Sequence, residues 1–126
     1  MDLSNLYNLL DTAQMDEKAG IKLQRVTGDE HFSFYVAEIL PMTWLKPHYH
    51  GEGIELYQII EGEGVMKTGR NENNLVIWDE EYTVRKGDCF TIPEGRVHQI
   101  GNLTNLRLIA GFTCPPSHLA GDRFFV

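Results

Sequence analysis

The stretch His48-Tyr49-His50-Gly51-Glu52-Gly53-Ile54-Glu55 decides how this sequence is interpreted. His48 and His50 are two residues apart, so on a β-strand their side chains point to the same face. Glu55 follows after a glycine-rich turn, and a second strand-like segment contributes His98. Three imidazoles and one carboxylate can hold a divalent transition metal and leave coordination positions open for another molecule. The sequence therefore predicts a metal site between β-strands.

The spacing of these residues matches a known pair of motifs at nine positions. The first segment is His48-x-His50, four residues, Glu55, six residues, Gly62; the second is Gly87, five residues, Pro93-x-Gly95, two residues, His98, three residues, Asn102. Both segments resemble the two conserved-barrel motifs of the cupin superfamily. One position departs from the pattern, because Met42 stands where the family usually has a glycine six residues before the first histidine. That position is a turn, so the departure leaves the metal inference unchanged.

The resemblance implies an all-β fold, namely a single-domain cupin barrel, also described as a double-stranded β-helix or jelly roll. We expect residues 21–126 to form this barrel, with the core motifs in residues 42–102. Residues 1–20 are predicted to form an N-terminal arm or a short helix, because their leucines recur at helical spacing. Ser4 or Asn5 can cap such a helix, and Gly20 can end it.

Short segments with alternating apolar and polar residues fill the rest of the chain, as in an all-β sandwich or barrel. Turn residues such as Gly62, Gly87 and Gly95 separate them. The predicted strands are 21–26, 32–40, 55–61, 65–68, 75–79, 81–85, 89–92, 98–103 and 106–112. Residues 69–74 are predicted to be a polar loop.

As metal ligands, His48, His50, Glu55 and His98 suit Mn(II), Fe(II), Co(II), Ni(II) or Zn(II), because the set contains no thiolate. The sequence does not choose among these ions. With four protein ligands, an octahedral ion keeps two positions for water or for two oxygens of a bound molecule. The alternative is a barrel without metal, in which the four side chains hydrogen-bond to one another. Burying them without a cation would cost several kcal/mol.

Size and composition exclude several classes of function. The 126 residues fit one domain. A net charge of −7 without a run of Lys or Arg argues against binding to nucleic acid or to an anionic membrane. No secretory signal and no apolar stretch of membrane-spanning length are present, so we expect a cytoplasmic protein. Cys89 and Cys114 lie far apart and are predicted to be reduced, buried thiols.

Two apolar features predict a homodimer. If Glu55 points into the barrel, Leu56 and Ile60 point outward, and an outward apolar row indicates cover by another subunit or by the N-terminal arm. The tail Arg123-Phe124-Phe125-Val126 is also too apolar to remain free in solvent. We expect strand or tail exchange between two subunits. The alternative is that the two phenylalanines fold back on their own barrel.

Other polar residues are weaker candidates for the site. Tyr57 is a candidate catalytic residue that would donate a hydrogen bond to a bound oxygen, although it can equally be a packed ring. Glu52 is a second candidate, as a mobile acid or base, against the alternative of a solvated turn residue. Arg96 can bind an anion at the mouth of the barrel or lie in solvent. His31 and His118 have no ligand-spaced partners and are interpreted as ordinary surface or tail residues.

Three hypotheses for function follow. The first is an enzyme that uses the metal as a Lewis acid on a small oxygen-rich metabolite such as a sugar, a keto acid or a related carboxylate. The resemblance implies isomerase, decarboxylase or lyase, and dioxygenase chemistry without selecting one. The second is a non-catalytic module that binds a sugar-like or other small metabolite. The third, a structural protein with an empty site, is disfavoured because the ligand set is complete.

Overall fold

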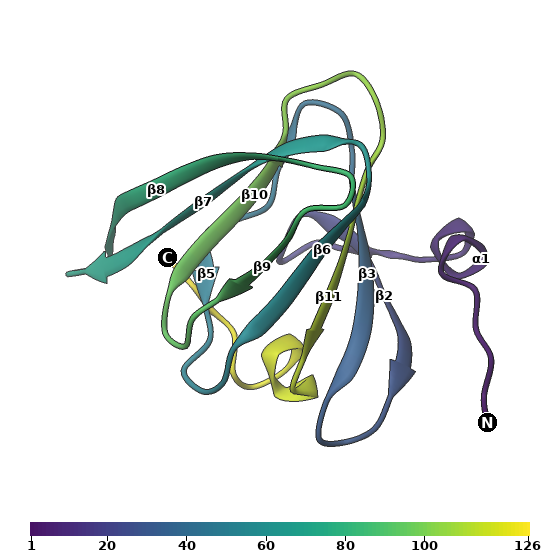
Figure 1. Ribbon diagram of the computed structural model, residues 1–126. Coiled ribbons are helices and arrows are strands. Elements are labelled where there is room, and N and C mark those ends of the chain that lie inside the picture. The colour runs from purple at the N-terminus through teal and green to yellow at the C-terminus, as the bar shows by residue number, and fades with distance from the viewer.

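The protein folds into two facing antiparallel β-sheets that enclose one interior (Figure 1). The computed structural model describes residues 1–126. In spatial order, the first sheet contains β1 (Met15–Asp16), β2 (Ile21–Gly28), β3 (Ser33–Ile39), β11 (Leu108–Cys114), β6 (Glu55–Glu61) and β9 (Cys89–Ile92). The second contains β12 (Phe124–Phe125), β5 (His48–Tyr49), β10 (Val97–Asn102), β7 (Glu63–Glu72) and β8 (Leu75–Arg85), with β4 (Thr43–Trp44) also paired to β10. The predicted all-β barrel is confirmed.

Strand β6 shows how the sequence alternation builds this interior. Glu55, Tyr57 and Ile59 are buried, whereas Leu56 and Gln58 are exposed. The pattern arises because successive side chains on a strand point to opposite faces of the sheet. The interior that holds Glu55 is therefore the same one that holds the apolar core, and the prediction that Glu55 points inward is confirmed.

The core consists of one cluster of sixteen buried residues between the sheets. It includes Ile39, Ile59, Ile100 and Leu108, each 2% exposed or less. Burying an aliphatic side chain of this size stabilises the fold by about 1.5–3 kcal/mol. The cluster includes Ile59 of β6 and Ile100 of β10, so the core helps to fix the strands that carry Glu55 and His98.

The N-terminal region forms a helix that is shorter than the leucine spacing suggests. Helix α1 covers Leu6–Asp11 and not the full stretch to Gly20, and the side chain of Asn5 accepts hydrogen bonds from two backbone N–H groups in its first turn. Its buried Leu10 packs with Ile60 of β6 on the outer face of the first sheet. The N-terminal region therefore covers Ile60, while Leu56 stays exposed. No helix in the protein has the length and apolar character needed to cross a membrane.

The hairpin of β7 and β8 differs from the prediction. Residues 69–74, expected to be a polar loop, continue the two strands up to a tight turn at Asn73 and Asn74, whose φ angles are 54° and 64°. Strand β8 also runs without a break through residues 81–85. Most side chains of β8 are exposed, so the sequence lacks the alternation of apolar and polar residues that would have indicated one continuous strand. The hairpin extends away from the barrel, to the left in Figure 1.

The C-terminal segment, residues 115–126, crosses one end of the barrel (yellow in Figure 1). It contains a short 3-10 helix, η1 (Pro116–Leu119), and strand β12, which pairs with β5. Phe124 lies opposite Tyr49, and Phe125 lies opposite His48. In this structure the two phenylalanines thus fold back on their own barrel, the second of the two arrangements considered from the sequence.

The two cysteines have different environments. Cys114 is buried at the end of β11, as predicted, but Cys89 on the edge strand β9 is exposed. The prediction of two buried thiols is therefore wrong for Cys89. Strand β9 pairs only with β6, so its outer edge and one face meet solvent.

Candidate metal centre

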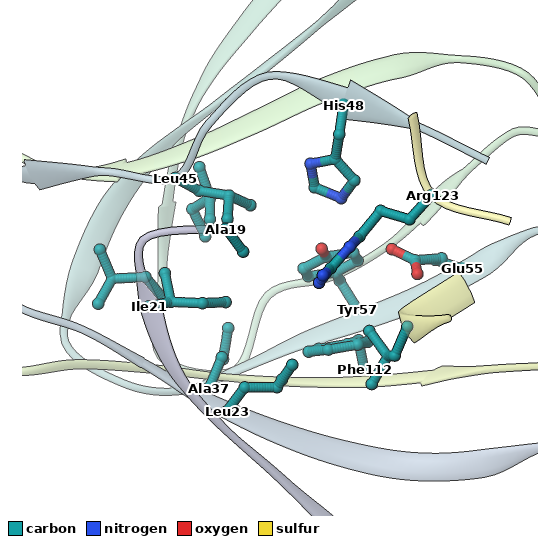
Figure 2. Close-up of a pocket in the computed structure, with 14 residues that line it drawn as sticks. Ala19, Ile21, Leu23, Ala37, Leu45, His48, Glu55, Tyr57, Phe112 and Arg123 are labelled. Carbon is teal, nitrogen blue, oxygen red and sulfur yellow. The ribbon is translucent and has the colours of Figure 1, made fainter. Parts of the chain in front are cut away.

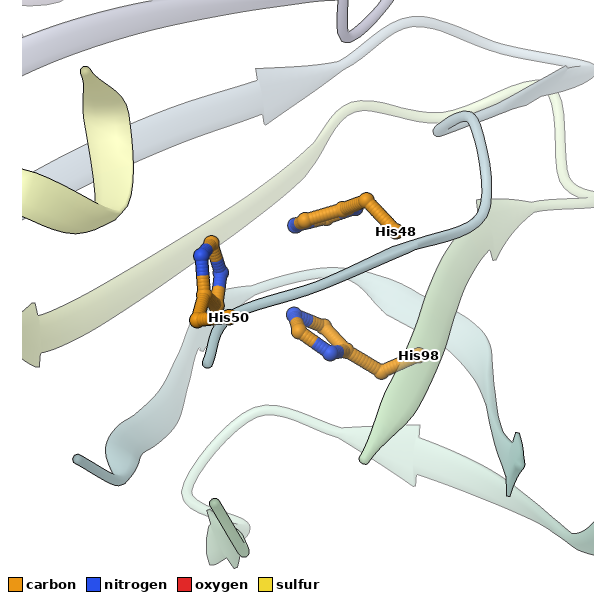
Figure 3. A group of neighbouring side chains, drawn as sticks. All are labelled: His48, His50 and His98. Atoms are coloured by element: carbon orange, nitrogen blue, oxygen red, sulfur yellow. The ribbon is translucent and has the colours of Figure 1, made fainter. Parts of the chain in front are cut away.

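Three histidines converge inside the barrel (Figure 3). His48 lies on β5, His50 follows directly after it, and His98 lies on β10 opposite His48. All three side chains are buried, and their candidate ligand atoms lie within 4.8 Å of one another. The prediction that His48 and His50 share one face is confirmed, and strand pairing brings the distant His98 to the same point.

The backbone fixes the orientation of each of these rings. In each case Nδ1 contacts a backbone carbonyl oxygen: His48 with Lys46 at 3.0 Å, His50 with Asp122 at 2.7 Å, and His98 with Arg96 at 3.0 Å. A carbonyl oxygen can only accept, so Nδ1 carries the proton and Nε2 keeps its lone pair. Second partners of this kind are typical of metal-binding histidines. The three lone pairs consequently face the interior.

Glu55 completes the group at the beginning of β6. Its Oε2 lies 3.1 Å from His50 Nε2, and its Oε1 lies 3.3 Å from His98 Nε2. His50 Nε2, His98 Nε2 and Glu55 Oε1 are fully buried and have no hydrogen-bond partner. With the protons on Nδ1, these contacts bring acceptor atoms together, which is unfavourable unless a cation lies among them. The donor set therefore fits a divalent metal ion.

Burial sets the charge state of the site. The pKa of His48 falls to about 3, because the desolvated imidazolium is disfavoured and the neighbouring His98 would repel it. Burial alone would raise the pKa of Glu55, but the pKa lies well below the ordinary value, and the hydrogen bond that His118 donates to Oε2 helps to lower it. A neutral imidazole and an ionised carboxylate are the forms that bind metal.

His118 joins this cluster, although no ligand-spaced residue in the sequence pointed to it. Its side chain is fully buried, with Nδ1 3.1 Å from Glu55 Oε2 and Nε2 in contact with the backbone oxygen of Glu52. Both oxygens can only accept, so both ring nitrogens donate and His118 is an imidazolium. Burial lowers its pKa, but the bonds to Glu55 and Glu52 and the nearby carboxylates outweigh it, so the pKa is raised. The interpretation of His118 as an ordinary tail residue is wrong, whereas His31 is exposed as expected.

The orientation of the His118 ring prevents His118 from binding the same ion as His50. The two rings stack with their centroids 4.0 Å apart and their planes 1° apart. A nitrogen lone pair lies in the plane of its ring, so one ion cannot lie in two parallel planes that are separated by a stacking distance. His118 acts instead through Glu55, whose Oε2 it holds while Oε1 faces His98.

Asp122 ties the C-terminal segment to the loop between His50 and Glu55. Its carboxylate accepts hydrogen bonds from the backbone N–H groups of Gly51 at 2.6 Å and Glu52 at 3.0 Å. Its backbone oxygen is the acceptor for His50 Nδ1. The side chain of Glu52 itself is exposed and does not line the cavity beside the cluster. The structure therefore brings the backbone of Glu52 to the site, but not its carboxylate.

A narrow cavity adjoins the histidine cluster (Figure 2). It has a volume of about 20 Å³, and eleven of the fourteen residues that line it are hydrophobic. The exceptions are His48, Glu55 and Arg123. Since a water molecule needs about 10–15 Å³ of such space, the cavity admits one small group with the C-terminal segment in place.

Tyr57 is a packed ring that also reaches the cavity, and its role as a donor to a bound oxygen stays a prediction. It is 6% exposed, and its ring stacks on Phe90 and Phe112 at centroid distances of 5.3 and 5.4 Å. It also lines the cavity. Burial, followed by the charge of Glu55, holds the pKa of Tyr57 well above its ordinary value. The phenol therefore stays protonated and can donate a hydrogen bond.

Two arginines, the predicted Arg96 and the unpredicted Arg123, occupy different places. Arg96 forms an ion pair with Asp79 of β8 at 2.9 Å and does not line the cavity. Arg123, which the sequence marked only as part of an apolar tail, lines it. Its ion pair with Asp16 at 2.7 Å joins the two ends of the chain. No spacing pattern linked Arg123 to the motif residues, so sequence reasoning had no signal for it.

This chain is a small β-barrel protein with an inward-facing cluster of histidines and a carboxylate that could hold a metal ion. Residues 35–112 match the family model described as the cupin domain, and the chain belongs to that family. The match spans β6 and β10 and thus includes all four motif residues of the cluster.

Individual relatives show the fold without fixing the activity. A protein of Methanocaldococcus jannaschii named uncharacterized protein MJ1618 is 36% identical over 66 residues, which are 52% of this chain and 44% of that protein. The chain thus spans less than half the length of this curated relative. TT1209 of Thermus thermophilus superimposes with a TM-score of 0.71 at 23% identity, covering 91% of this chain and 98% of the other. The oxalate decarboxylase formate complex of Lactobacillus farciminis gives 0.70 at 18% identity, covering 92% and 34%.

Proposed function

We propose that this protein is a metal-dependent cupin enzyme that acts on a small oxygen-rich metabolite. His48, His50, Glu55 and His98 would hold the ion. The observation that carries the proposal is the set of buried acceptor atoms without partners, His50 Nε2, His98 Nε2 and Glu55 Oε1, which face one another. A divalent ion bound there supplies a Lewis acid that polarises an oxygen of the ligand.

The chain's own residues support a defined environment for that chemistry. The apolar walls exclude water and strengthen electrostatic interactions inside the cavity. Tyr57 is the proposed hydrogen-bond donor to a ligand oxygen, because its phenol is protonated and faces the cavity. The suggested role of Glu52 as a mobile acid or base stays a prediction that lacks support from the geometry, since its side chain is exposed.

The identity of the ion is proposed only as a group. Nitrogen and oxygen donors without thiolate suit Mn(II), Fe(II), Co(II), Ni(II) and Zn(II). The reaction stays within the isomerase, decarboxylase or lyase, and dioxygenase classes. The likeness to an oxalate decarboxylase, at 18% identity, supports the fold and does not select among them.

A second candidate function is a non-catalytic cupin that binds a small metabolite. The apolar lining of the cavity favours it, because Tyr57 is the only group there, apart from the candidate ligands and Arg123, that can exchange a proton or donate a hydrogen bond. An enzyme and a binding module differ in whether the metal-loaded protein converts a bound sugar, keto acid or carboxylate. Product analysis by NMR after incubation with such compounds distinguishes them.

We also propose that the protein is a cytoplasmic homodimer. Leu56 on the outer face of β6 is 48% exposed, and Leu75, Trp78 and Tyr82 are exposed along the edge strand β8. An exposed apolar edge strand of this length is suited to pairing with a second chain. Two free cysteines support a reducing compartment. Light scattering at several protein concentrations tests the dimer.

The ligand assignment is tested by elemental analysis of untagged protein purified without added metal. We expect about one divalent ion per chain in the wild type and a sharp loss in His50→Ala, because Nε2 of His50 is a proposed ligand atom. The matched control is His31→Ala, because His31 is an exposed histidine whose charged neighbour is Glu30 and not a member of the cluster. Equal metal content in wild type and His50→Ala would contradict the assignment.

A further inference from the structure

Arg123 brings a permanent positive charge from the C-terminal segment into the barrel. Its side chain is only 10% exposed, and it lines the same cavity as His48 and Glu55. Figure 2 shows the guanidinium reaching inward from the chain end toward the region of Tyr57. A guanidinium stays protonated at every ordinary pH, so burying it demands partners for its charge and its donors.

The partners present in the structure leave most of those donors unused. Arg123 Nη1 donates to Asp16 Oδ2 at 2.7 Å, and no other hydrogen bond of this guanidinium is present. The other oxygen of Asp16 already accepts from the backbone N–H groups of Lys18 and Ala19. The Phe125 ring lies 5.2 Å from Arg123 Cζ and covers it without accepting a conventional hydrogen bond. A planar guanidinium with free donors is suited to a second, planar anion.

The remainder of the cavity limits what such an anion can carry. Its walls include Ile21, Ile39, Leu45 and Phe112, none of which can pair with a hydroxyl group. A sugar would bury several hydroxyls against these walls without partners, at a cost of about 1–3 kcal/mol each. A molecule with its polar atoms at one end and a short apolar remainder avoids that cost. The cavity holds little more than one water-sized group, so such a molecule must widen it on binding, which favours a short chain.

We propose that Arg123 is the anion-binding residue of the cavity and that the ligand is a small carboxylate with a short apolar remainder. The carboxylate would contact the guanidinium, and the apolar part would lie against the aliphatic wall. This inference rests on the proposed function, because the candidate metal ligands His48 and Glu55 line the same cavity. It narrows the substrate class from oxygen-rich metabolites to short monocarboxylates and keto acids.

A purely structural role for Arg123 makes a different prediction. In that case the ion pair with Asp16 only fastens the C-terminal segment to β1, and replacing Arg123 lowers stability without a preference among ligands. The anion-binding role predicts a loss that is specific for charged ligands. It also predicts that removing the charge of Asp16 frees a donor of Arg123 and tightens the binding of a carboxylate.

The experiment is calorimetric titration of the Mn(II)-treated full chain with propanoate and, separately, with its neutral isostere propanamide. We expect propanoate to bind and propanamide to bind at least about tenfold more weakly, because a charge-assisted bond is roughly twice as strong as a neutral one. Arg123→Met should weaken propanoate binding by about tenfold or more, and Arg123→Lys by less, since it keeps the charge but loses the planar fork. Asp16→Asn should tighten propanoate binding.

The matched control is Arg70→Met, because Arg70 also pairs with carboxylates, Glu72 and Asp79, but lies on the outer hairpin. It should bind propanoate as the wild type does. Equal binding of propanoate and propanamide, or unchanged propanoate binding in Arg123→Met, overturns the inference. If Arg123→Met does not fold, unchanged or weaker binding in Asp16→Asn overturns it.

Metal content measured on the same samples separates this inference from the proposed function. A chain that takes up none of Mn(II), Fe(II), Co(II), Ni(II) and Zn(II) refutes the metal centre. The propanoate titration of that metal-free chain then still tests Arg123, because the guanidinium needs no ion to contact a carboxylate. A chain that holds Mn(II) but shows no charge preference refutes only the role of Arg123.

Discussion

The barrel strands and the C-terminal segment meet at one centre but contribute to it differently. Strands β5, β6 and β10 supply His48, Glu55 and His98, and His50 follows directly after β5. The C-terminal segment supplies His118, Asp122 and Arg123, which approach from one end of the barrel. The strands thus present the candidate ligand atoms, and the segment orients them and closes the cavity. The motif alone describes only half of the site.

The difference has a physical basis in how each set is held. His98 and Glu55 lie on the longer strands β10 and β6, and pairing with β10 places His48 of the two-residue strand β5 opposite His98. The residues of the C-terminal segment depend on a two-residue strand, β12, and on the hydrogen bonds of Asp122 to the 51–52 turn. A segment with so few ladder bonds is more easily detached than the longer strands β6 and β10. The two regions should therefore respond differently to substitution.

The largest effect is expected at Glu55, where the two regions are joined. Glu55→Ala removes one candidate metal ligand and leaves the His118 imidazolium buried without its main counter-charge. Removing one partner of a buried charged pair costs about 3–5 kcal/mol. Urea unfolding of the metal-free protein should show a loss of this size, with loss of metal in elemental analysis. A variant as stable as the wild type would contradict the proposed ion pair between Glu55 and His118.

A smaller effect on metal binding is expected from His118→Gln. Because His118 orients Glu55 without ligating the ion, the variant should still bind one ion per chain, with affinity lowered about 10–100-fold. Competition against a chelator of known affinity measures this change. The control is His31→Gln on the surface. Complete loss of the ion in His118→Gln would instead make His118 a ligand and would contradict the argument from its stacking on His50.

The fold and half of the site could be predicted from the sequence for local reasons. Alternation along residues 55–61 indicated the buried face of β6, and turn glycines such as Gly62, with φ 88°, delimited the strands. The hairpin of β7 and β8 was missed in part because strands exposed on both faces carry no apolar alternation. His118 was missed because its partner Glu55 lies 63 positions away. A contact of that kind depends on the path of the C-terminal segment and leaves no periodic pattern.

His48 on a barrel strand and His118 on the C-terminal segment should change the stability of the protein with pH in opposite directions. The folded pKa of His48 lies at about 3, below the unfolded value of 6.5. Between these values only the unfolded chain binds the proton, so stability falls as the pH is lowered, by up to about 1.4 kcal/mol per unit. The folded pKa of His118 is raised, so its contribution is complete below pH 6.5 and is lost as the pH rises through the folded pKa.

The metal-free protein should accordingly be most stable near the unfolded histidine pKa, about 6.5. Urea unfolding across a series of pH values checks this expectation. His48→Gln should flatten the acid side of the profile, and His118→Gln should flatten the alkaline side. An alkaline side that is unchanged in His118→Gln would show that His118 is not the imidazolium inferred from its two acceptors.

The smallest effect concerns a barrel position that departs from the family pattern. Met42 has φ 57° and is 71% exposed, so the structure places a methionine in the left-handed region where glycine is favoured. A left-handed conformation costs a residue with a Cβ about 1–2 kcal/mol, whereas glycine loses about 0.5–1 kcal/mol of backbone entropy. Met42→Gly should therefore raise the free energy of unfolding by about 0.5–1 kcal/mol.

The control is Met15→Gly, because Met15 is also exposed but lies on β1 without a positive φ, and this variant should lose stability. Equal losses in both variants would show that backbone strain at Met42 is relieved elsewhere in the turn.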